Sequence, residues 1–244
     1  GREMRKFFTA REGWVLVDAD YSQIELRVLA DISGDKNMID AFKNNQDIHA
    51  ITASQVFNMP LDFVTGEMRS RAKAVNFGIV YGIGAYSLAK DIGVTNKEAK
   101  NYIESYLKHY SGIDKYMHDV VEKAKDTGYV ETVFGRRRYL PELSASNGMT
   151  RAFGERVARN APIQGTAADI IKIAMIKVDK RLTEENLEAR LVLQVHDELI
   201  VECPSHESMR VAMILQEEME KAVSLSVPLV ADSAVGKTWY DAKG

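Results

Sequence analysis

Short apolar stretches that lie far apart in the chain place the strongest constraint on its fold. The first, Trp14–Val17, stops at two aspartates, and the second is the pair 191–195 and 199–201, which flanks His196-Asp197-Glu198. A third stretch covers 227–230. Short apolar runs of this kind, bounded by turn residues, are typical of buried strands. Because helical patterns fill the intervals, the sequence predicts an α+β fold whose small sheet collects strands from three distant regions.

Helical spacing of apolar residues covers most of the remaining chain. Asp47 stands at a helix N-cap position, and Gly128 suits a C-terminal cap. Thr95 and Glu98 form the pattern of a capping box. Pro162 lies within a helical pattern, where a proline predicts a break or a kink. The predicted helices cover 22–34, 49–57, 68–92 (weakened by three glycines), 95–106, 113–128, 150–178 and 205–223, and a hairpin is predicted around 135–137.

The composition is that of a globular protein from a reducing compartment. The chain has 244 residues, 45% of them hydrophobic and 27% charged, which allows a sizeable core and excludes wholesale disorder. The formal net charge of -3 argues against a simple cationic nucleic-acid binder, although residues 128–160 are rich in arginine. Cys203 is the single cysteine, and no apolar stretch is long enough for a membrane span. We therefore expect a cytoplasmic protein without a membrane partner.

Acidic residues follow the predicted strands closely. Asp20 comes just after the strand at 14–17, and Asp197 and Glu198 lie at the turn of the later strand pair. Carboxylates at strand ends can converge on hard cations, and two such ions about 3.5 to 4 Å apart recur in phosphoryl-transfer sites. Taken alone, the pattern is more typical of solvated acidic turns, so other residues must decide.

Cations and aromatic rings share one face of the helix predicted to begin near Met68. The members of this stripe stand four positions apart, with the cations toward the N-terminus. The arrangement suits a phosphate chain held by the cations and a flat base or sugar resting on an aromatic ring. The alternative is a core helix with snorkelling cations, which the stripe alone does not exclude. Its members are Arg69, Lys73, Phe77 and Tyr81.

Together these features resemble the motifs of the family A DNA polymerases. Residues 20–27 (Asp-Tyr-Ser-Gln-Ile-Glu-Leu-Arg) resemble motif A, the helix with the stripe resembles motif B, and 194–198 (Gln-Val-His-Asp-Glu) resembles motif C. They occur in the family's order, and 156–169 between motifs B and C matches as well. The resemblance implies an α+β fold with a polymerase palm, built on a small antiparallel sheet, and a helical fingers subdomain. The implied bounds are 1–66 and 129–244 for the palm and 67–128 for the fingers.

The resemblance implies a catalytic site that holds two Mg²⁺ ions. The expected metal ligands are Asp20, Asp197 and the backbone carbonyl of Tyr21, since hard cations take oxygen ligands. One ion would activate the primer 3′-hydroxyl, and the other would stabilise the leaving pyrophosphate. Glu198 is expected to assist near the primer terminus, and Lys73 to donate a proton to pyrophosphate. The expected catalytic residues are thus Asp20, Asp197, Glu198 and Lys73.

The resemblance also implies contacts with a dNTP and with primer–template DNA. Arg69, Lys73 and His49 would bind the triphosphate, although a lone histidine is more often structural. Phe77 would pack on the nucleotide, Tyr81 would occupy the templating position until the fingers close, and Glu25 would block a ribose 2′-hydroxyl. The expected nucleotide-binding residues are Gln23, Glu25, His49, Arg69, Lys73, Phe77 and Tyr81, and the expected DNA-binding residues are Arg156, Asn160, Gln164 and His196.

The implied activity is template-directed DNA synthesis by a monomeric enzyme. Only 19 residues precede Asp20, so we expect the thumb and exonuclease domains to be absent and synthesis by this chain alone to be weak or lacking. The alternatives are a non-catalytic binding module, a two-metal nuclease or phosphatase, and a single-subunit RNA polymerase. The binding module has no use for Lys73 beside the two aspartates, the nuclease leaves the aromatic stripe unexplained, and Glu25 argues against the RNA polymerase.

Overall fold

The computed structural model describes residues 2–243 and divides into two compact units. The sheet unit comprises the residues up to 24 and from 167 onward, and the helical unit comprises 25–166. The sheet unit contains η1 (Arg2–Phe7), β1 (Trp14–Tyr21), β4 (Arg190–Val195), β5 (Glu198–Pro204), η4 (Ser205–Glu207), α9 (Ser208–Glu220), β6 (Ala231–Gly236) and α10 (Trp239–Lys243). The helical unit contains α1 (Ile24–Ser33), α2 (Lys36–Lys43), α3 (Ile48–Val56), η2 (Leu61–Phe63), α4 (Gly66–Val80), α5 (Ala85–Ile92), α6 (Asn96–His109), α7 (Ser111–Thr127), β2 (Tyr129–Glu131), β3 (Arg137–Tyr139) and η3 (Pro141–Ser144), and α8 (Gly148–Glu184) runs through the division.

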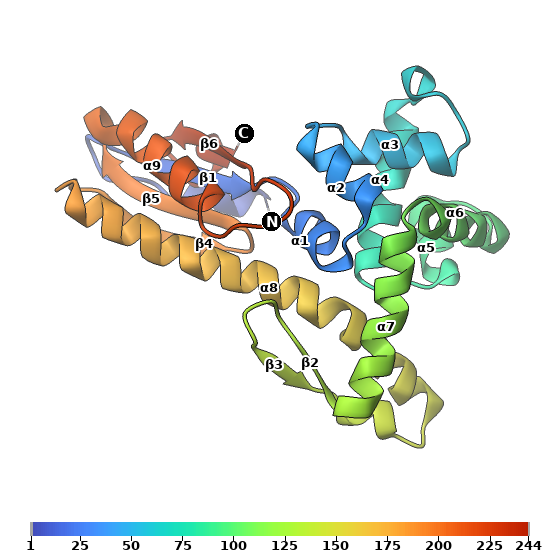
Figure 1. Ribbon diagram of the computed structural model, residues 1–244. Helices are drawn as coiled ribbons and strands as arrows, with labels where there is room; N and C mark the ends of the chain where they lie inside the picture. Colours follow the sequence, from blue (N-terminus) through green and yellow to red (C-terminus); the bar gives the residue numbers. More distant parts are fainter. Residues whose placement is uncertain (1, 244) are drawn as a thin grey trace. The chain divides into compact units, whose positions relative to one another are not determined.

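The sheet unit is built on a four-stranded antiparallel sheet in the order β4-β5-β1-β6 (Figure 1). Helix α9 packs along it, and the hydroxyl of Tyr21 donates to the carbonyl of Met219 at 2.6 Å. Residues of β1 alternate between the two faces of the sheet. On the face opposite to that of Tyr21 and α9, Leu16 packs with Ile200 and Trp239. Both faces of β1 are therefore covered, which explains why its first half is a continuous apolar run.

The predicted mixture of helices with a small antiparallel sheet from three distant regions is confirmed, but one strand was misplaced. The stretch 227–230 is irregular, and the last strand, β6, covers Ala231–Gly236 instead. Val227 and Leu229 are buried, so their apolar character reflects burial in a loop. Strand β6 pairs with β1 alone and lies at the sheet edge, where a polar sequence is tolerated.

Local signals placed most helix ends of the helical unit correctly. Asp47 caps α3 by accepting hydrogen bonds from the backbone N–H groups of His49 and Ala50, and Thr95 and Glu98 form the predicted capping box. Helix α7 ends at Gly128, whose φ of 78° is left-handed. The predicted helix 68–92 is interrupted between α4 and α5, where Gly82 and Gly84 lie, whereas Gly78 is accommodated within α4.

One helix was missed, and two helix predictions differ from the structure. Helix α2 was not predicted, although Asp35 caps it through the N–H of Met38. The helix predicted over 205–223 begins later and ends earlier, as α9. Of the break or kink predicted at Pro162, the break is absent: α8 continues through this residue. Buried neighbours such as Ala158 and Ile163 hold this part of the helix in place despite the backbone hydrogen bond that a proline cannot make.

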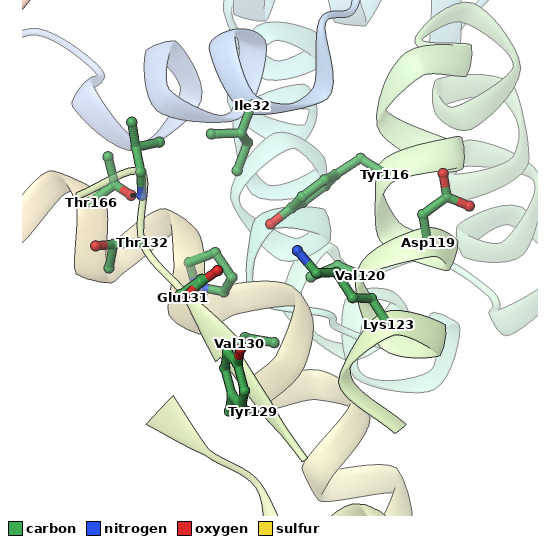
Figure 2. A pocket seen from close by; sticks show the side chains of 12 residues that line it. Ile32, Tyr116, Asp119, Val120, Lys123, Tyr129, Val130, Glu131, Thr132 and Thr166 are labelled. Carbon is green, nitrogen blue, oxygen red and sulfur yellow. Dashed lines mark hydrogen bonds between the residues drawn. The ribbon is translucent and has the colours of Figure 1, made fainter. Parts of the chain in front are cut away.

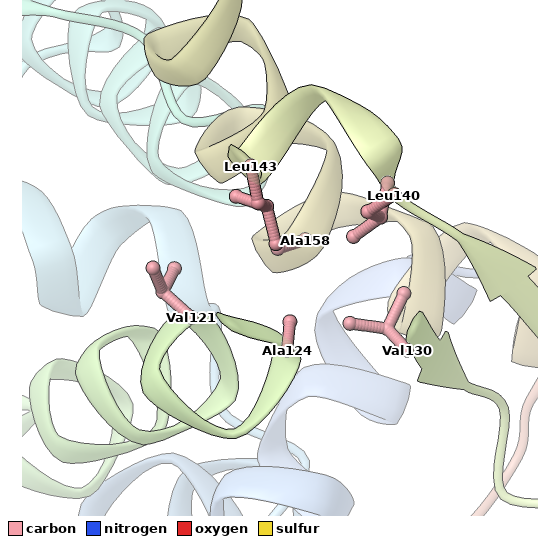
Figure 3. Close-up of a cluster of buried hydrophobic side chains, with 6 residues drawn as sticks. All are labelled: Val121, Ala124, Val130, Leu140, Leu143 and Ala158. Atoms are coloured by element: carbon pink, nitrogen blue, oxygen red, sulfur yellow. The ribbon is translucent and has the colours of Figure 1, made fainter. Parts of the chain in front are cut away.

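A buried apolar cluster explains how α8 is held at this point (Figure 3). Helix α7, strand β2 and the segment around η3 contribute side chains that surround Ala158 of α8. Burial of such side chains stabilises a domain by about 25 cal/mol per Å² of apolar surface. Burial of about 100 Å² therefore contributes about 2.5 kcal/mol, more than the roughly 1 kcal/mol of one backbone hydrogen bond. The buried members of the cluster are Val121, Ala124, Val130, Leu140, Leu143 and Ala158.

Within residues 2–243, no helix combines the length and apolar character needed to cross a bilayer.

Candidate functional site

Carboxylates gather at one end of the sheet because of the strand register. Asp20 of β1 lies directly opposite Glu198 of β5, and Asp18 lies on the same face of β1, two residues earlier. Asp197 lies in the two-residue turn between β4 and β5. The N–H of Tyr21 donates to the carbonyl of Asp197 at 3.1 Å and so ties this turn to the end of β1. The structure thus brings together the acidic residues that the sequence analysis singled out.

Burial and mutual repulsion disfavour several negative charges in this cluster. Asp18 is 3% exposed, and burial together with the charge of Glu198 raises its pKa to about 7. Burial and the charge of Asp20 raise the pKa of Asp197 to about 6. Both carboxylate oxygens of Asp18, Oδ1 of Asp20 and Oε1 of Glu198 are buried without a hydrogen-bond partner. A positive charge placed beside such carboxylates stabilises their ionised form.

Lys243 supplies one positive charge to the cluster. Its ammonium group lies 2.7 Å from Oδ2 of Asp20 and also pairs with Glu198. Burial alone would lower the pKa of Lys243, but these two ion pairs outweigh burial and raise it. The lysine comes from α10, at the far end of the chain from β1. The carboxylates therefore bind a cation at this point.

The donor set fits a hard metal ion. Asp20 and Asp197 offer carboxylate oxygens, of which Oδ1 of Asp20 is buried and unpartnered, and the backbone of Tyr21 is tied to that of Asp197 by the hydrogen bond from its N–H group. Mg²⁺ accepts one or two protein carboxylates and completes its shell with water and substrate phosphates. Among residues 2–243, no group of three or more His, Cys, Asp or Glu side chains is arranged as an all-protein metal site. A site with few protein ligands, open to substrate oxygens, agrees with the unpartnered oxygen of Asp20 and with the lack of an all-protein site among these residues.

The predicted stripe lies on α4, in the helical unit. Arg69 and Lys73 are exposed, and the ring of Tyr81 is 44% exposed. The rings of Phe77 and Tyr81 are stacked with their centroids 6.4 Å apart, and Lys73 lies 6.0 Å from the centroid of Phe77. The alternative of a core helix does not hold for these positions, because the cations and the Tyr81 ring face outward.

Two carboxylates already hold groups of this stripe. The Arg69 Nε atom donates to Oδ2 of Asp47 at 2.6 Å. The Tyr81 hydroxyl donates to Oε2 of Glu25 at 2.9 Å, which brings the predicted ribose-excluding residue next to the stripe. Burial would raise the pKa of Asp47, but hydrogen bonds from Arg69 and from backbone N–H groups lower it.

His49 is buried beside the stripe, at the start of α3. Its ring lies 5.9 Å from that of Phe77, and its Nδ1 atom is 2.9 Å from the Nδ2 atom of Asn76. Burial and the positive charge of Arg69 lower the pKa of His49 to about 4. The imidazole is therefore neutral near pH 7 and offers one N–H group.

The predicted DNA-binding residues of α8 stand four positions apart on one face of the helix. Arg156 and Gln164 are exposed, whereas Asn160 is partly buried and its Oδ1 atom lacks a partner. A cleft of the helical unit is lined by Phe77, Tyr81 and Arg156, among others. A Cβ atom at Gly82 would lie 3.3 Å from Cγ of Arg156, so the loop after α4 lies against α8 at this cleft.

Two predicted residues of the sheet unit have left-handed backbones. Gln23 has φ of 56° and its Oε1 atom is buried without a partner, while His196 has φ of 54° and is exposed. A left-handed φ is uncommon outside glycine and is costly unless the surroundings impose it. At His196 the left-handed backbone forms the two-residue turn that contains Asp197.

Sequence reasoning missed several residues of these clusters. Asp18 could have been found, since it stands two positions before Asp20 and a strand places both on one face. Lys243 is 223 positions from Asp20, and no local pattern connects them. Asn76 and Thr52 are buried polar residues within helices, which only tertiary structure brings next to His49.

A separate pocket of about 300 Å³ lies between α7, β2 and α8 (Figure 2). Its lining is mainly apolar, and Tyr116 and Lys123 of α7 point toward it from one side. None of the residues predicted for catalysis or binding lines it. The residues of the helical unit that are predicted to bind nucleotide or DNA lie instead on α1, α3, α8 and the stripe on α4.

Comparison with known proteins settles the family. The sequence model described as DNA polymerase family A matches residues 1–241. The chain belongs to DNA polymerase family A. Family A relatives include the DNA polymerase I of Bacillus subtilis, 54% identical over 244 residues, and that of Caldicellulosiruptor bescii, 51% identical over 243 residues. Each match covers 100% of this chain but only 28% and 29% of the respective relative, so the chain spans less than a third of their length.

A solved family A structure has the same fold. It is described as the POL domain of Pol1 from M. smegmatis in complex with DNA primer-template and dNTP. The TM-score is 0.94 at 45% sequence identity, and the match covers 100% of this chain and 43% of the mycobacterial one. The resemblance to family A seen in the sequence motifs is thus confirmed by both comparisons.

Proposed function

We propose that the chain carries the nucleotidyl-transfer site of a DNA-directed DNA polymerase. In this reaction the primer 3′-oxygen forms a bond to the α-phosphorus of a dNTP, and the bond from that phosphorus to the bridging oxygen breaks to release pyrophosphate. The observation that carries the proposal is the register of β1 and β5, which sets Asp20 opposite Glu198 in a family A chain. Primer–template DNA and dNTP, which the mycobacterial structure holds, are the proposed partners.

The sheet unit would provide the metal-binding part of the site. Asp20, Asp197 and the Tyr21 carbonyl would hold two Mg²⁺ ions, which when bound lower the pKa of the primer hydroxyl and neutralise phosphate charge. Glu198 lies opposite Asp20 and would assist near the primer terminus. His196, exposed at the same turn, would contact the primer strand.

The helical unit would bind the nucleotide. Arg69 and Lys73 are exposed cations that suit the triphosphate, and Lys73 would donate the proton that the leaving pyrophosphate takes up. Phe77 would pack on the sugar and base. Glu25, held by Tyr81, would exclude a ribose 2′-hydroxyl.

Contacts with DNA would come from the exposed face of α8. Arg156 and Gln164 can donate hydrogen bonds to the minor groove, where the acceptors are nearly the same for every correct base pair. Such donors recognise the geometry of the pair rather than its sequence. Asn160 lies between them on the same face.

Single-turnover primer extension tests the proposal. The chain is present in excess over primer–template, and Mg²⁺ and one dNTP are added. We expect only the nucleotide complementary to the template to be added, at a low rate for the chain alone. Asp197→Ala should lower that rate about 10²-fold or more, because a metal ligand is lost. Asp179→Ala removes an exposed carboxylate of α8 and serves as the matched control. Extension that persists in Asp197→Ala, or that ignores the template, would contradict the proposal.

A further inference from the structure

A chain of buried polar side chains lies behind His49 in the helical unit. The exposed fractions of Thr52 and Asn76 are 0%, and that of His49 is 2%. The Thr52 hydroxyl donates to Oδ1 of Asn76 at 3.1 Å, and it also lies 3.5 Å from the hydroxyl of Tyr110. Because buried polar groups are costly unless they are paired, this network fixes the orientation of its members.

The direction of the hydrogen bonds determines where His49 carries its proton. Thr52 donates to the carbonyl oxygen of Asn76, so the amide NH₂ group of Asn76 faces His49. An amide nitrogen only donates, and the Nδ1 atom of His49, 2.9 Å away, must therefore accept. In a neutral imidazole with Nδ1 as acceptor, the proton resides on Nε2.

The surroundings keep the ring neutral. Arg69 and Lys73 are cations near His49 and oppose a further positive charge there, whereas Asp47 favours it. Burial has the largest effect and acts in the same direction as the two cations. Within residues 2–243, no hydrogen bond engages the Nε2 atom of His49, which leaves its N–H group available to a ligand.

We propose that Asn76, oriented by Thr52, is a positioning residue that holds His49 in the Nε2–H tautomer, so that the histidine presents a hydrogen-bond donor to an anionic phosphate oxygen. The proposal rests on the proposed function in one respect, namely that the anion is the triphosphate of a nucleotide. With the opposite tautomer, a lone pair would face the phosphate and repel it. Thr52 and Asn76 thus act on the substrate through His49 without touching it.

Long-range ¹H–¹⁵N NMR of the ¹⁵N-histidine-labelled chain reads the tautomer directly. The signals of His49 are assigned from their loss in His49→Gln. At pH 7 we expect a protonated Nε2 and an unprotonated Nδ1 in the wild-type chain. Thr52→Val removes the hydroxyl at constant volume and charge, so Asn76 loses its orienting donor and both tautomers should appear. Asn76→Asp places a carboxylate oxygen at Nδ1, and the proton should move to that atom.

Nucleotide affinity supplies the second readout. In Thr52→Val we expect the dNTP KM or Kd to rise about twofold at nearly unchanged kcat, because about half of the molecules keep the binding-competent tautomer. In Asn76→Asp, where the proton moves to Nδ1, we expect a rise of about tenfold, since a hydrogen bond to a charged phosphate is worth about that factor. Asn101→Asp, which adds the same charge at an exposed position of α6, is the control for Asn76→Asp.

The outcomes separate the two proposals. An Nδ1–H tautomer in the wild-type chain overturns the inference, as does an unchanged Nε2–H tautomer in folded Thr52→Val. Beyond the assignment by His49→Gln, the wild-type tautomer is read without Thr52→Val or Asn76→Asp, so it does not depend on the folding of these two variants. If the tautomer is as expected but the chain binds no dNTP, the proposed function fails while the assignment of Asn76 as the residue that orients His49 stands.

Discussion

The ammonium group of Lys243 lies 2.7 Å from Oδ2 of Asp20 and pairs with Glu198 as well. These are two of the carboxylates that we place at the catalytic centre. Lys243 therefore already pairs with Asp20, a carboxylate proposed to bind Mg²⁺, and with Glu198, which is proposed to act beside it. At the proposed metal site, Mg²⁺ and Lys243 would bind the same carboxylate, so the side chain would compete with the metal before substrate arrives.

Lys243→Ala should therefore raise the affinity of the chain for Mg²⁺ or Mn²⁺ by about 3- to 10-fold, the factor by which the competing side chain reduces the binding-competent fraction. Isothermal titration without DNA or nucleotide measures this. Lys221→Ala removes an exposed lysine of the same unit and corrects for the change in net charge. Equal metal affinities in the two variants would show that Lys243 does not compete.

Glu25 and Tyr81 offer a test of sugar selection. Glu25→Ala should reduce the preference for dNTP over NTP, expressed as a ratio of kcat/KM, by about 10²-fold, because it removes the group that we propose to exclude the 2′-hydroxyl. Tyr81→Phe keeps the ring but removes the 2.9 Å hydrogen bond that holds Glu25. We expect it to reduce the preference less than Glu25→Ala does. A preference that is unchanged in Glu25→Ala would refute the assignment and reopen the RNA polymerase alternative.

Asp18 makes stability depend on pH. Its pKa is about 7 in the folded chain against an ordinary value of 3.8, so between these values the folded state binds more protons than the unfolded state. Stability from this group is fully present below pH 3.8 and is lost as the pH rises through about 7. Asp18→Asn cannot lose a proton, and its stability relative to wild type should increase by about 1 to 3 kcal/mol between pH 5 and pH 8.

Urea denaturation in EDTA at several pH values measures this difference, and EDTA prevents metal ions from stabilising the charged carboxylates. Asp197, with its pKa raised to about 6, titrates in both proteins, so the difference between them reports the substitution of Asp18. Parallel pH profiles of the wild-type chain and Asp18→Asn would mean that Asp18 is ionised at low pH in the folded chain.

Local sequence signals predicted those parts of the structure that local physics determines. Asp47 and Thr95 cap helices wherever their side chains can reach the free N–H groups of the first turn, so their role is visible from a few residues. A strand that is buried on both faces must be apolar, which made β1 recognisable. Strand β6 has no such requirement at the sheet edge, and Val227 and Leu229 are buried from a loop, so hydrophobicity pointed to the wrong segment.

For the site, the motif residues were predictable and their partners were not. Asp20 and Glu198 were singled out by the motifs, and the register then set them opposite each other. Lys243, Asn76 and Thr52 acquire their roles only through contacts between distant segments. The predicted bounds of palm and fingers, the metal ligands and the roles of individual residues stay predictions.

Gly165 shows how a motif position can serve packing. A Cβ atom at this residue of α8 would lie 2.6 Å from Cγ2 of Thr132, in the segment after β2. Gly165→Ala should therefore destabilise the chain by about 1 to 3 kcal/mol, because the segment must move away from α8. Gly66→Ala is the matched control, since nothing lies within 4 Å of a Cβ atom there. Urea denaturation measures the free energy of unfolding of both variants.

A second substitution tests whether this contact is the cause. Thr132→Ser removes the Cγ2 methyl group but keeps the hydroxyl oxygen, which accepts hydrogen bonds from the N–H groups of Phe134 and Arg136 at 3.3 and 3.2 Å. In the Thr132→Ser background, Gly165→Ala should cost little, and the helix propensity of alanine could even make it favourable by about 0.5 to 1 kcal/mol. A double-mutant cycle should thus give a coupling energy of about 1 kcal/mol or more between these two positions. If Gly165→Ala is equally destabilising in both backgrounds, the methyl group of Thr132 is not what requires glycine at this turn of α8.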